Sequence, residues 1–417
     1  MRLDVYKIRR DFPALKQKIN KKPVIYMDSA CVSLKPVQVI DAVSRYYTDF
    51  PSCAGRSSHV FAKRVLDEVY NSRMEVRKFI NAKKTEEIIF TKNSTEGINI
   101  IANSLNLRKG ESVLISDKEH NSLLAPFQML REKGIKLKFF RFGDIMDFKE
   151  KLTEDVRIVS TAHISNLDGT ANPVKKIIRL SHKNNSLVLI DSAQSVPHMK
   201  INVRSLNPDF LVFSGHKVFG PSGTGVLYGK LDALEKLKSF TLGGGAVKDS
   251  TYKTYEIEKI PQRMEAGLQN YSGIIGLAEA LRYFRKVGIS RAATHEQMLN
   301  KLVSDELSRE EVEILGDNDY KKRTGILSFN IKGFDSHEIA GMLNESSNIM
   351  IRSGMHCVHS WLNSNKINGS ARISFSIYNT IEECMTLIEE VMKILKLNNS
   401  KKPIKRMNAL KFPPYER

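Results

Sequence analysis

A lysine follows directly on a short apolar stretch of the chain, in the sequence Ser214-Gly215-His216-Lys217. An amine at a strand end in a buried cleft loses solvation, which lowers its pKa and makes it a usable nucleophile. The serine and the histidine beside it can donate hydrogen bonds to a phosphate, and the glycines of residues 220–225 let the backbone approach such a group closely. Alone, the tetrapeptide is weak evidence, because most lysines are solvated surface charges.

A carboxylate has the same kind of position, since Asp191 ends the apolar run of residues 187–190. Pyridoxal phosphate (PLP) needs a carboxylate paired with its pyridine nitrogen, because the protonated ring is the electron sink for a carbanion at the substrate Cα. Asp191 suits that task, and Gln194 could hydrogen-bond the phenolic oxygen of the cofactor. By itself Asp191 would be interpreted as a helix N-cap or a turn residue.

Polar residues follow other apolar runs as well. Ser94 and Thr95 open a helical stretch, where free N–H groups and the positive end of the helix dipole make an anion site, here for the cofactor phosphate. His120 could stack on the pyridine ring, and Asn166 could reach the cofactor oxygen or the substrate. Each has an ordinary interpretation too: a capping sequence, a structural histidine and a turn.

A cysteine decides between reactions, because a lysine with PLP permits transamination, racemisation or elimination alike, whereas sulfur transfer also needs a thiolate. Cys357 ends the sequence Arg352-Ser353-Gly354-Met355-His356-Cys357. A free thiol with a pKa of about 8.5 is only partly ionised, and a cationic Arg352 or His356 nearby could lower that value. We interpret Cys357 as a nucleophile rather than a buried core cysteine, and Cys31, Cys53 and Cys384 as structural.

The elements that must position these residues alternate between about residues 85 and 230. Short apolar runs at 88–90, 113–115, 158–160, 187–190 and 210–213 each precede an amphipathic or polar stretch, and one helix is expected to start near Pro173. Repeated strand–helix units predict a mainly parallel sheet with helices on both faces. Because ligands bind beyond the carboxyl ends of such strands, the polar residues above are expected to share one site.

The 417 residues exceed one typical domain. We expect a large domain over residues 21–290 and a smaller α+β domain over 291–417, joined by the N-terminal segment 1–20. The glycines of residues 243–245 mark a break after the sheet, and a helical stretch over 272–287 leads toward the second domain. From Asn398 onward the sequence is typical of an extended basic appendage, either disordered or docked on the body.

Composition narrows the class of protein. No run of eighteen apolar residues and no secretory signal is present, so a cytoplasmic protein without a membrane partner is expected. Four cysteines without a CxxC pattern are too few for a disulfide scaffold and indicate no metal site. The net charge of +19 is spread along the chain without a nucleic-acid-binding signature, so no nucleic acid is expected; the charge favours solubility or an acidic protein partner.

Together these motifs are more specific than any one of them. The order STEGIN, EHNS, SNLDGTANPV, DSAQSVPH, FSGHKVFGPSGTGVLYG, RMEAGLQN, RSGMHC and ARISFSIYN resembles the class V aminotransferase family of fold-type I PLP enzymes. Within that family the sequence is similar to the Suf-type (group II) cysteine desulfurase and selenocysteine lyase branch. The resemblance runs from about Tyr26 to Val391. It implies a fold-type I α/β transferase with a large PLP-binding domain and a smaller C-terminal domain, acting as a homodimer.

The resemblance also implies a role for each site residue. It makes Lys217 the Schiff-base lysine, Asp191 the partner of the pyridine nitrogen, and Arg372 the group that grips the substrate carboxylate with a bidentate fork. The remaining roles are phosphate contacts for Thr95, Ser94, Ser214 and His216, ring stacking for His120, the cofactor oxygen for Gln194, and substrate contacts for Asn166 and Arg352.

The implied reaction removes sulfur from L-cysteine, giving L-alanine and a persulfide on Cys357 that passes to a sulfur acceptor or iron–sulfur scaffold protein for cluster assembly. Three alternatives stay open: a selenocysteine lyase, another class V enzyme such as an aminotransferase or epimerase, and an inactive basic scaffold or nucleic-acid binder. Two segments depart from the family pattern. Cys31 follows Asp28-Ser29-Ala30 where the family usually has alanine, and Leu268-Gln269 replaces a Thr-Pro pair, where Gln269 could substitute for the threonine.

Overall fold

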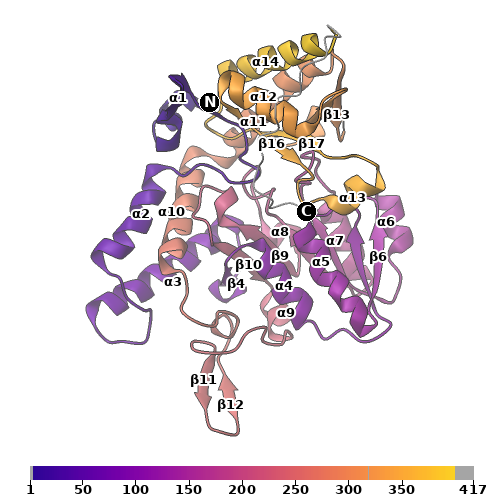
Figure 1. The fold of residues 1–417 in the computed structure, drawn as a ribbon. Coiled ribbons are helices and arrows are strands. Elements are labelled where there is room, and N and C mark those ends of the chain that lie inside the picture. The colour runs from indigo at the N-terminus through magenta and orange to yellow at the C-terminus, as the bar shows by residue number, and fades with distance from the viewer. Residues whose placement is uncertain (1–2, 318, 400–417) are drawn as a thin grey trace.

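The core of the computed structural model, which describes residues 3–317 and 319–399, is a seven-stranded sheet (Figure 1). Its strands lie in the order β4 (Ile88–Thr91), β10 (Gly225–Gly229), β9 (Phe210–Ser214), β8 (Leu187–Asp191), β7 (Val156–Ala162), β5 (Ser112–Ser116) and β6 (Lys136–Phe140). Neighbours from β9 to β6 are parallel, whereas β10 runs antiparallel to both β9 and β4. The predicted mainly parallel sheet is confirmed. β6 and β10 were not predicted; β10 begins at Gly225, the last glycine of the stretch 220–225, for which we expected only a close approach of the backbone to a phosphate.

Helices cover both faces of this sheet. Successive strand residues point to opposite faces, and in strands such as β4 the residues on both faces are buried against helices. In β4, Ile88 and Phe90 join an apolar cluster with α3 (Val60–Ile80) and α10 (Tyr271–Val287), while Ile89 joins a second cluster with α4 (Ser94–Ser104) and α5 (Asn121–Gln128). The predicted helix near Pro173 is α7. Further helices of this unit are α2 (Val37–Asp49), α6 (Ile145–Lys151), α7 (Val174–Lys183), α8 (Val203–Leu206) and α9 (Leu231–Glu235).

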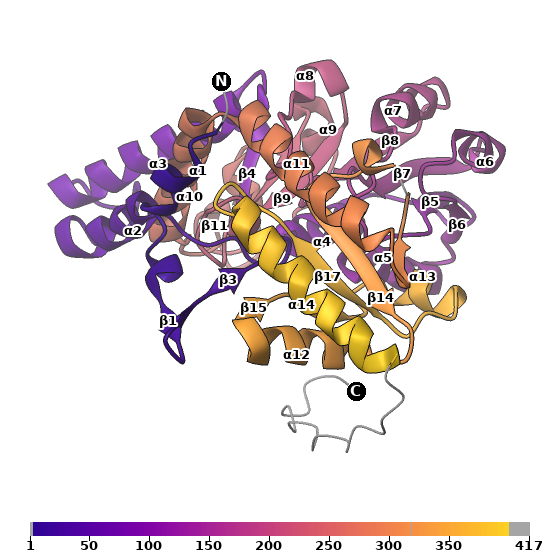
Figure 2. The same cartoon turned by 90° about the horizontal axis from the view of Figure 1, so that it is seen from above.

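A smaller antiparallel sheet follows later in the chain. Its strands lie in the order β13 (Val312–Leu315), β14 (Ile326–Ile331), β17 (Ser370–Ser374) and β16 (Arg352–Gly354). Leu299, Ile339 and Leu387 pack in one core with Phe329 and Ile373 of this sheet. They come from α11 (Ile289–Leu307), α12 (Ser336–Ser347) and α14 (Ile381–Asn399), which lie together over the sheet when seen from above (Figure 2). A short helix, α13 (His359–Ser364), follows the Cys357 segment.

The described part of the N-terminal segment contacts both units. The Phe12 ring lies 5.9 Å from the Phe219 ring, beside the large sheet, and 4.9 Å from the Tyr378 ring, in the later part of the chain. After α1 (Val5–Arg9) come the paired strands β1 (Lys18–Ile19) and β2 (Lys22–Pro23), and then β3 (Ile25–Tyr26), which pairs in parallel with β15 (Ile349–Met350). The division into domains 21–290 and 291–417, joined by residues 1–20, stays a prediction.

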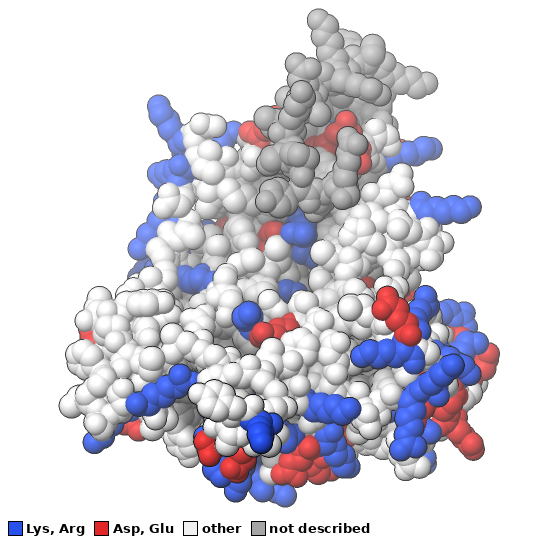
Figure 3. Space-filling view, turned by 60° about the horizontal axis from the view of Figure 1, so that its bottom comes forward, with Lys and Arg blue, Asp and Glu red and all other residues white. Residues whose placement is uncertain are grey.

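The periphery shows three further features. A hairpin of β11 (Val247–Ser250) and β12 (Tyr255–Ile257) follows the glycines of 243–245 and projects from the body (Figure 1). The predicted basic appendage starts with the last residues of α14 and otherwise lies outside the described residues. Within the described ranges, none of the helices combines the length and the apolar character needed to cross a membrane. On the face shown in Figure 3, Lys and Arg are interspersed with Asp and Glu.

Candidate active site

The candidate site lies at the carboxyl ends of β8 and β9. Asp191 is the last residue of β8, and Lys217 ends the 3-10 turn Gly215–Lys217 that follows β9. Burial lowers the pKa of the Lys217 amine, and the Asp191 carboxylate opposes that shift. Burial raises the pKa of Asp191, and the charge of Lys217 opposes that shift in turn. The two groups are therefore close enough to stabilise each other's charged form.

The surroundings of Lys217 connect it to both halves of the predicted site. Its pKa is lowered further by Arg372 and raised by Cys31 and Cys357, all through electrostatic interactions and none through a hydrogen bond within the described residues. Asp191 is held by its backbone neighbour, because Oδ1 accepts a hydrogen bond from the Ala193 N–H at 2.9 Å. The amine is thus left without a fixed partner while the carboxylate is oriented.

The start of α4 is held against the end of β9. Gly225 in β10 permits this approach, since a Cβ there would lie 2.6 Å from the Asn93 Cα. The Ser94 N–H donates to the Ser214 Oγ at 2.9 Å, and the two serine hydroxyls are 2.8 Å apart. Thr95 is exposed at this open helix end, where N–H groups have no partner within the helix. Ser94, Thr95 and Ser214 are brought together at a position suited to an anion.

Two histidines that were predicted to contact the cofactor, His216 and His120, are neutral at physiological pH. Burial lowers the pKa of His216 to about 4, and the charge of Lys217 adds to the shift. Burial lowers the pKa of His120 to about 3, and Lys217 and Arg372 contribute in the same direction. The His120 Nδ1 accepts a hydrogen bond from the Ser122 N–H at 3.0 Å, so its neutral ring carries the proton on Nε2. A neutral ring is the form that the predicted stacking role requires.

Gln194 supplies a test of whether PLP fits these residues. Its Nε2 donates to the Ala30 carbonyl at 2.8 Å, while its Oε1 is buried with no partner among the described residues. A buried polar atom without a partner is costly unless a ligand satisfies it. The orphaned amide oxygen, the Lys217 amine, the Asp191 carboxylate and the anion site at α4 together match a ring hydroxyl, an aldehyde, a ring nitrogen and a phosphate. The residues fit PLP.

Arg372 in β17 lies on the other side of the site and is buried. Its NH1 donates to the Asn166 carbonyl at 2.8 Å and its NH2 contacts the Asp28 Oδ1 at 3.3 Å, while its Nε has no partner in the described part of the chain. Burial lowers the pKa of Arg372, and Asp28 opposes the shift. The Asn166 Nδ2 donates to the His356 carbonyl at 2.8 Å. Asn166 therefore links the arginine to the segment that carries Cys357.

The Cys357 segment is a tight loop between β16 and α13. His356 and Cys357 both have left-handed backbones, with φ of +50° and +58°, although neither is glycine. Such residues are strained unless their surroundings hold them. Here Asn121 N–H donates to the Cys357 carbonyl at 2.7 Å, and Asn166 holds the preceding carbonyl. The Cys357 side chain is partly exposed, and its interaction with Lys217 places it in the site.

The structure corrects one of the two predicted sources of positive charge for Cys357, namely His356. Burial lowers the pKa of His356 to about 2, and its Nε2 lies 2.9 Å from the Ser370 carbonyl, so this histidine is neutral. Arg352, paired opposite Arg372 across β16 and β17, donates from NH1 to the Cys31 Sγ at 3.2 Å. His356 cannot act as the predicted cation, and the hydrogen bond of Arg352 goes to a different thiol.

Cys31 and Asp28 are site residues that sequence reasoning missed. Cys31, which we interpreted as structural, contacts the guanidinium of Arg352, and Asp28 contacts that of Arg372. The departure from the family pattern at residues 28–31 was the signal that could have found them. By contrast, Cys384 is buried in the core of the smaller unit, as the structural interpretation expects.

The other departure from the family pattern concerns Gln269. Its amide Nε2 donates to the Glu265 carbonyl at 2.9 Å and to the Ala266 carbonyl at 3.1 Å. The side chain thus closes its own turn, while Leu268 beside it is exposed. The predicted substitution of Gln269 for a threonine hydroxyl stays a prediction.

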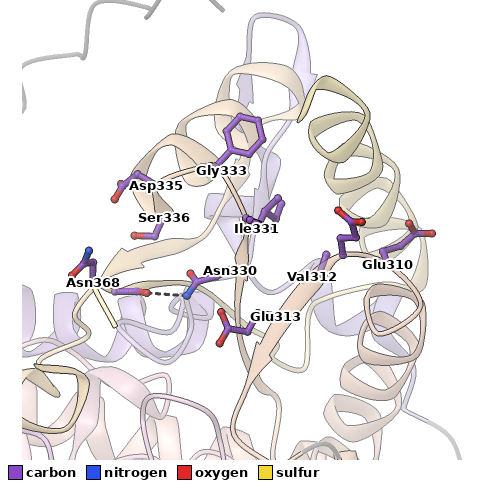
Figure 4. A pocket seen from close by; sticks show the side chains of 13 residues that line it. Glu310, Val312, Glu313, Asn330, Ile331, Gly333, Asp335, Ser336 and Asn368 are labelled. Atoms are coloured by element: carbon purple, nitrogen blue, oxygen red, sulfur yellow. Dashed lines mark hydrogen bonds between the residues drawn. The ribbon is translucent and has the colours of Figure 1, made fainter. Parts of the chain in front are cut away.

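A pocket of about 760 Å³ in the smaller unit is not part of this site (Figure 4). Its walls carry carboxylates from two segments, and none of the predicted site residues lines it. The side chains that surround it include Glu310, Glu313, Asn330, Asp335 and Ser336. In the described residues, no group of three or more His, Cys, Asp or Glu side chains could hold a metal ion.

Comparisons with known proteins agree with this geometry. A family model described as "Aminotransferase class-V" matches residues 25–387. A protein of Halalkalibacterium halodurans named probable cysteine desulfurase is 36% identical over 405 residues, covering 94% of this chain and 98% of its own. The apo structure of a cysteine desulfurase from Thermococcus onnurineus has a TM-score of 0.90 at 34% identity, covering 95% and 99%. A cysteine desulfurase structure from Escherichia coli has a TM-score of 0.86 at 29% identity, covering 94% and 99%.

Proposed function

We propose that this chain, which belongs to the class V aminotransferase family, is a PLP-dependent cysteine desulfurase that removes sulfur from L-cysteine and releases L-alanine. The observation that carries the proposal is the convergence on one amine. Lys217 interacts electrostatically with Asp191 from the large sheet, with Arg372 from the small sheet and with Cys357 from the loop. A PLP site, a carboxylate-binding arginine and a sulfur nucleophile therefore share one space.

The residues that would hold PLP lie on the large-sheet side. Lys217 would bind its aldehyde carbon, Asp191 its ring nitrogen, and Gln194 its ring oxygen. Ser94, Thr95, Ser214 and His216 would hold the phosphate, with the neutral His120 ring against the pyridine. When bound, PLP supplies an electron sink that stabilises negative charge at the substrate Cα and so weakens the bond from Cβ to sulfur.

The substrate is held from the small-sheet side. The Arg372 guanidinium would bind the carboxylate of L-cysteine, since its Nε is buried without a partner and its NH1 is fixed by the Asn166 carbonyl. Burial lowers the pKa of the Lys217 amine, and a neutral Nζ can take a proton from the substrate Cα. Lys217 thus serves in proton transfer once the substrate has released it.

Cys357 would receive the sulfur. Its Sγ thiolate attacks the substrate sulfur, forming the new S–S bond of a persulfide as the Cβ–S bond breaks. The electron pair of the broken bond stays with the carbon fragment, which takes up protons and leaves as L-alanine. The anchored carbonyls of residues 356 and 357 set the position of this thiol.

The protein is expected to act as a homodimer and to pass its sulfur to an acceptor or scaffold protein for iron–sulfur cluster assembly in the cytoplasm. Two regions of exposed apolar side chains support self-association. On α2 and α3 these are Tyr47, Val60, Phe61, Leu66 and Tyr70, and on the projecting hairpin they are Tyr252 and Tyr255. The free thiol of Cys357 must stay reduced, which fits a reducing compartment.

The experiment that tests the function compares Cys357→Ser with the wild-type enzyme loaded with PLP. The variant should keep the yellow colour of bound PLP and lose both alanine and persulfide formation from L-cysteine. Cys53→Ser, outside the site, is the matched control and should behave as the wild type. Alanine formation by Cys357→Ser at the wild-type rate, or amine transfer to an added keto acid by the wild type, would contradict the proposal.

A further inference from the structure

A short N-terminal segment, residues 28–31, lies between the two halves of the active site. The Ala30 carbonyl accepts from Gln194 on the cofactor side at 2.8 Å. The Ala30 N–H donates to the Ser374 Oγ at 2.9 Å, and the Asp28 carboxylate contacts Arg372 on the substrate side. The position of this segment is therefore fixed from both directions.

Cys31 ends this segment and faces a group of cations. Its Sγ accepts a hydrogen bond from the Arg352 NH1 at 3.2 Å. Arg352 lies opposite Arg372 across the paired strands β16 and β17. Lys217 and Arg372 both interact electrostatically with Cys31, and Arg372 has a buried Nε without a partner among the described residues. The hydrogen bond from Arg352 fixes the position of the Cys31 sulfur on the side of the segment that faces the site.

Cys31 is not the only thiol in this space. Cys357 interacts with the same Lys217 amine, and its loop is tied to Arg372 through Asn166. Both thiols are partly exposed rather than buried in the core. Two cysteines from distant parts of the sequence thus interact electrostatically with one amine, and Arg352, one of the two cations considered for Cys357, donates its hydrogen bond to Cys31.

We propose that Cys31 is a second sulfur-carrying thiol, which takes the outer sulfur from the Cys357 persulfide and holds it as a persulfide of its own. The inference rests on the proposed function, because Cys357 must first be charged from L-cysteine. Arg352 serves as the positioning residue that holds the Cys31 sulfur toward the site. The group that Cys31 carries is one sulfane sulfur atom, and its transfer from Cys357 to Cys31 needs no cofactor.

The transfer step is balanced without an added oxidant or reductant. The Cys31 thiolate attacks the terminal sulfur of the Cys357 persulfide, and a new S–S bond forms at Cys31. The S–S bond at Cys357 breaks, and its electron pair remains on Cys357 as a thiolate. Cys357 is then ready to accept sulfur from a second L-cysteine before any acceptor protein has bound. Each protomer can therefore store two sulfur atoms.

The test is a burst experiment with the PLP-loaded enzyme, L-cysteine and no acceptor, stopped by alkylation and followed by peptide mass mapping. The wild type should release about two alanines per protomer in the burst and carry persulfide sulfur on the peptides of both Cys31 and Cys357. Cys31→Ser keeps a hydrogen-bond acceptor for Arg352 but cannot carry sulfur, so its burst should fall to about one alanine per protomer, with persulfide on Cys357 alone. Cys53→Ala should match the wild type.

Several outcomes would overturn the inference. One is a wild-type burst of a single alanine with Cys31 unmodified and Cys357 charged; another is a second sulfur found as a polysulfide on Cys357. Persulfide on Cys31 in the Cys357→Ser variant would overturn the order of transfer. A complete absence of alanine and of persulfide on Cys357 would instead refute the proposed function, so the two failures can be told apart.

Discussion

Replacing Asn166 by alanine removes one hydrogen bond from the loop that carries Cys357. The Asn166 Nδ2 donates at 2.8 Å to the His356 carbonyl, a buried acceptor within the strained pair at φ +50° and +58°. A buried carbonyl left without its donor costs about 1–3 kcal/mol. At about 1.4 kcal/mol for each factor of ten, the productive loop geometry should lose about 5- to 150-fold in population. The contact of Arg372 with Asn166 survives, because that bond uses the Asn166 backbone carbonyl.

Steady-state kinetics of alanine formation separate this positioning role from direct binding. If Asn166 acts through the loop, Asn166→Ala should lower kcat by the factor above while KM for L-cysteine and the affinity for PLP change little. Asn121→Ala is the control: it keeps the backbone N–H that holds the Cys357 carbonyl and loses only the side-chain contact with His359 at 2.9 Å, so it should lower kcat less than Asn166→Ala does. A raised KM with unchanged kcat would refute the reasoning and support the predicted contact of Asn166 with the substrate.

Three further predictions follow from single contacts. Arg372→Lys loses the planar fork and should lower kcat/KM for L-cysteine by about 10- to 150-fold through KM, measured by alanine release; an unchanged KM would contradict it. Glu119→Gln should raise the melting temperature more at about pH 8 than at about pH 5. Burial raises the Glu119 pKa from 4.5 to about 8, so the wild-type native state loses stability as the pH rises between these values, and the neutral glutamine avoids that loss. An equal change in melting temperature at both pH values would contradict this prediction. Gly225→Ala should cost about 1–3 kcal/mol of stability in denaturant unfolding and weaken PLP binding, because its Cβ would meet the Asn93 backbone; a neutral substitution would contradict it.

The sequence predicted the large sheet well because its strands are buried on both faces. Residues 88–90, 113–115, 158–160, 187–190 and 210–213 are continuous apolar runs, and each became a strand of the seven-stranded sheet. β10 was not predicted because it begins and ends with a glycine, and glycine is a weak signal for a strand. β6 was not predicted because only one of its five residues is buried, so its sequence lacks a continuous apolar run.

The positions of Lys217, Asp191, Ser94 and Ser214 were predictable for the same reason, since each is fixed by the end of a buried element or the start of one. The protonation state of His356 was not predictable from the sequence. Whether a histidine is charged depends on the atoms packed around it, and only the fold shows that His356 is buried beside two guanidinium groups. The same holds for Arg352, whose partner lies 321 positions away in the sequence.

The charges around Lys217 suggest why the two sheets must meet for the reaction to proceed. Burial is the main cause that lowers the pKa of the Lys217 amine and Arg372 lowers it further, while Asp191, Cys31 and Cys357 raise it. A substrate carboxylate bound to Arg372 would neutralise the contribution of Arg372 and leave the others, so the amine should hold a proton more tightly once the substrate is in place. Lys217 therefore becomes a stronger base at the moment when the Cα proton is within reach. In the cofactor-free protein, Arg372→Gln should already show that higher pKa without substrate, and a pH profile of Lys217 acylation that shows no such rise would exclude this coupling.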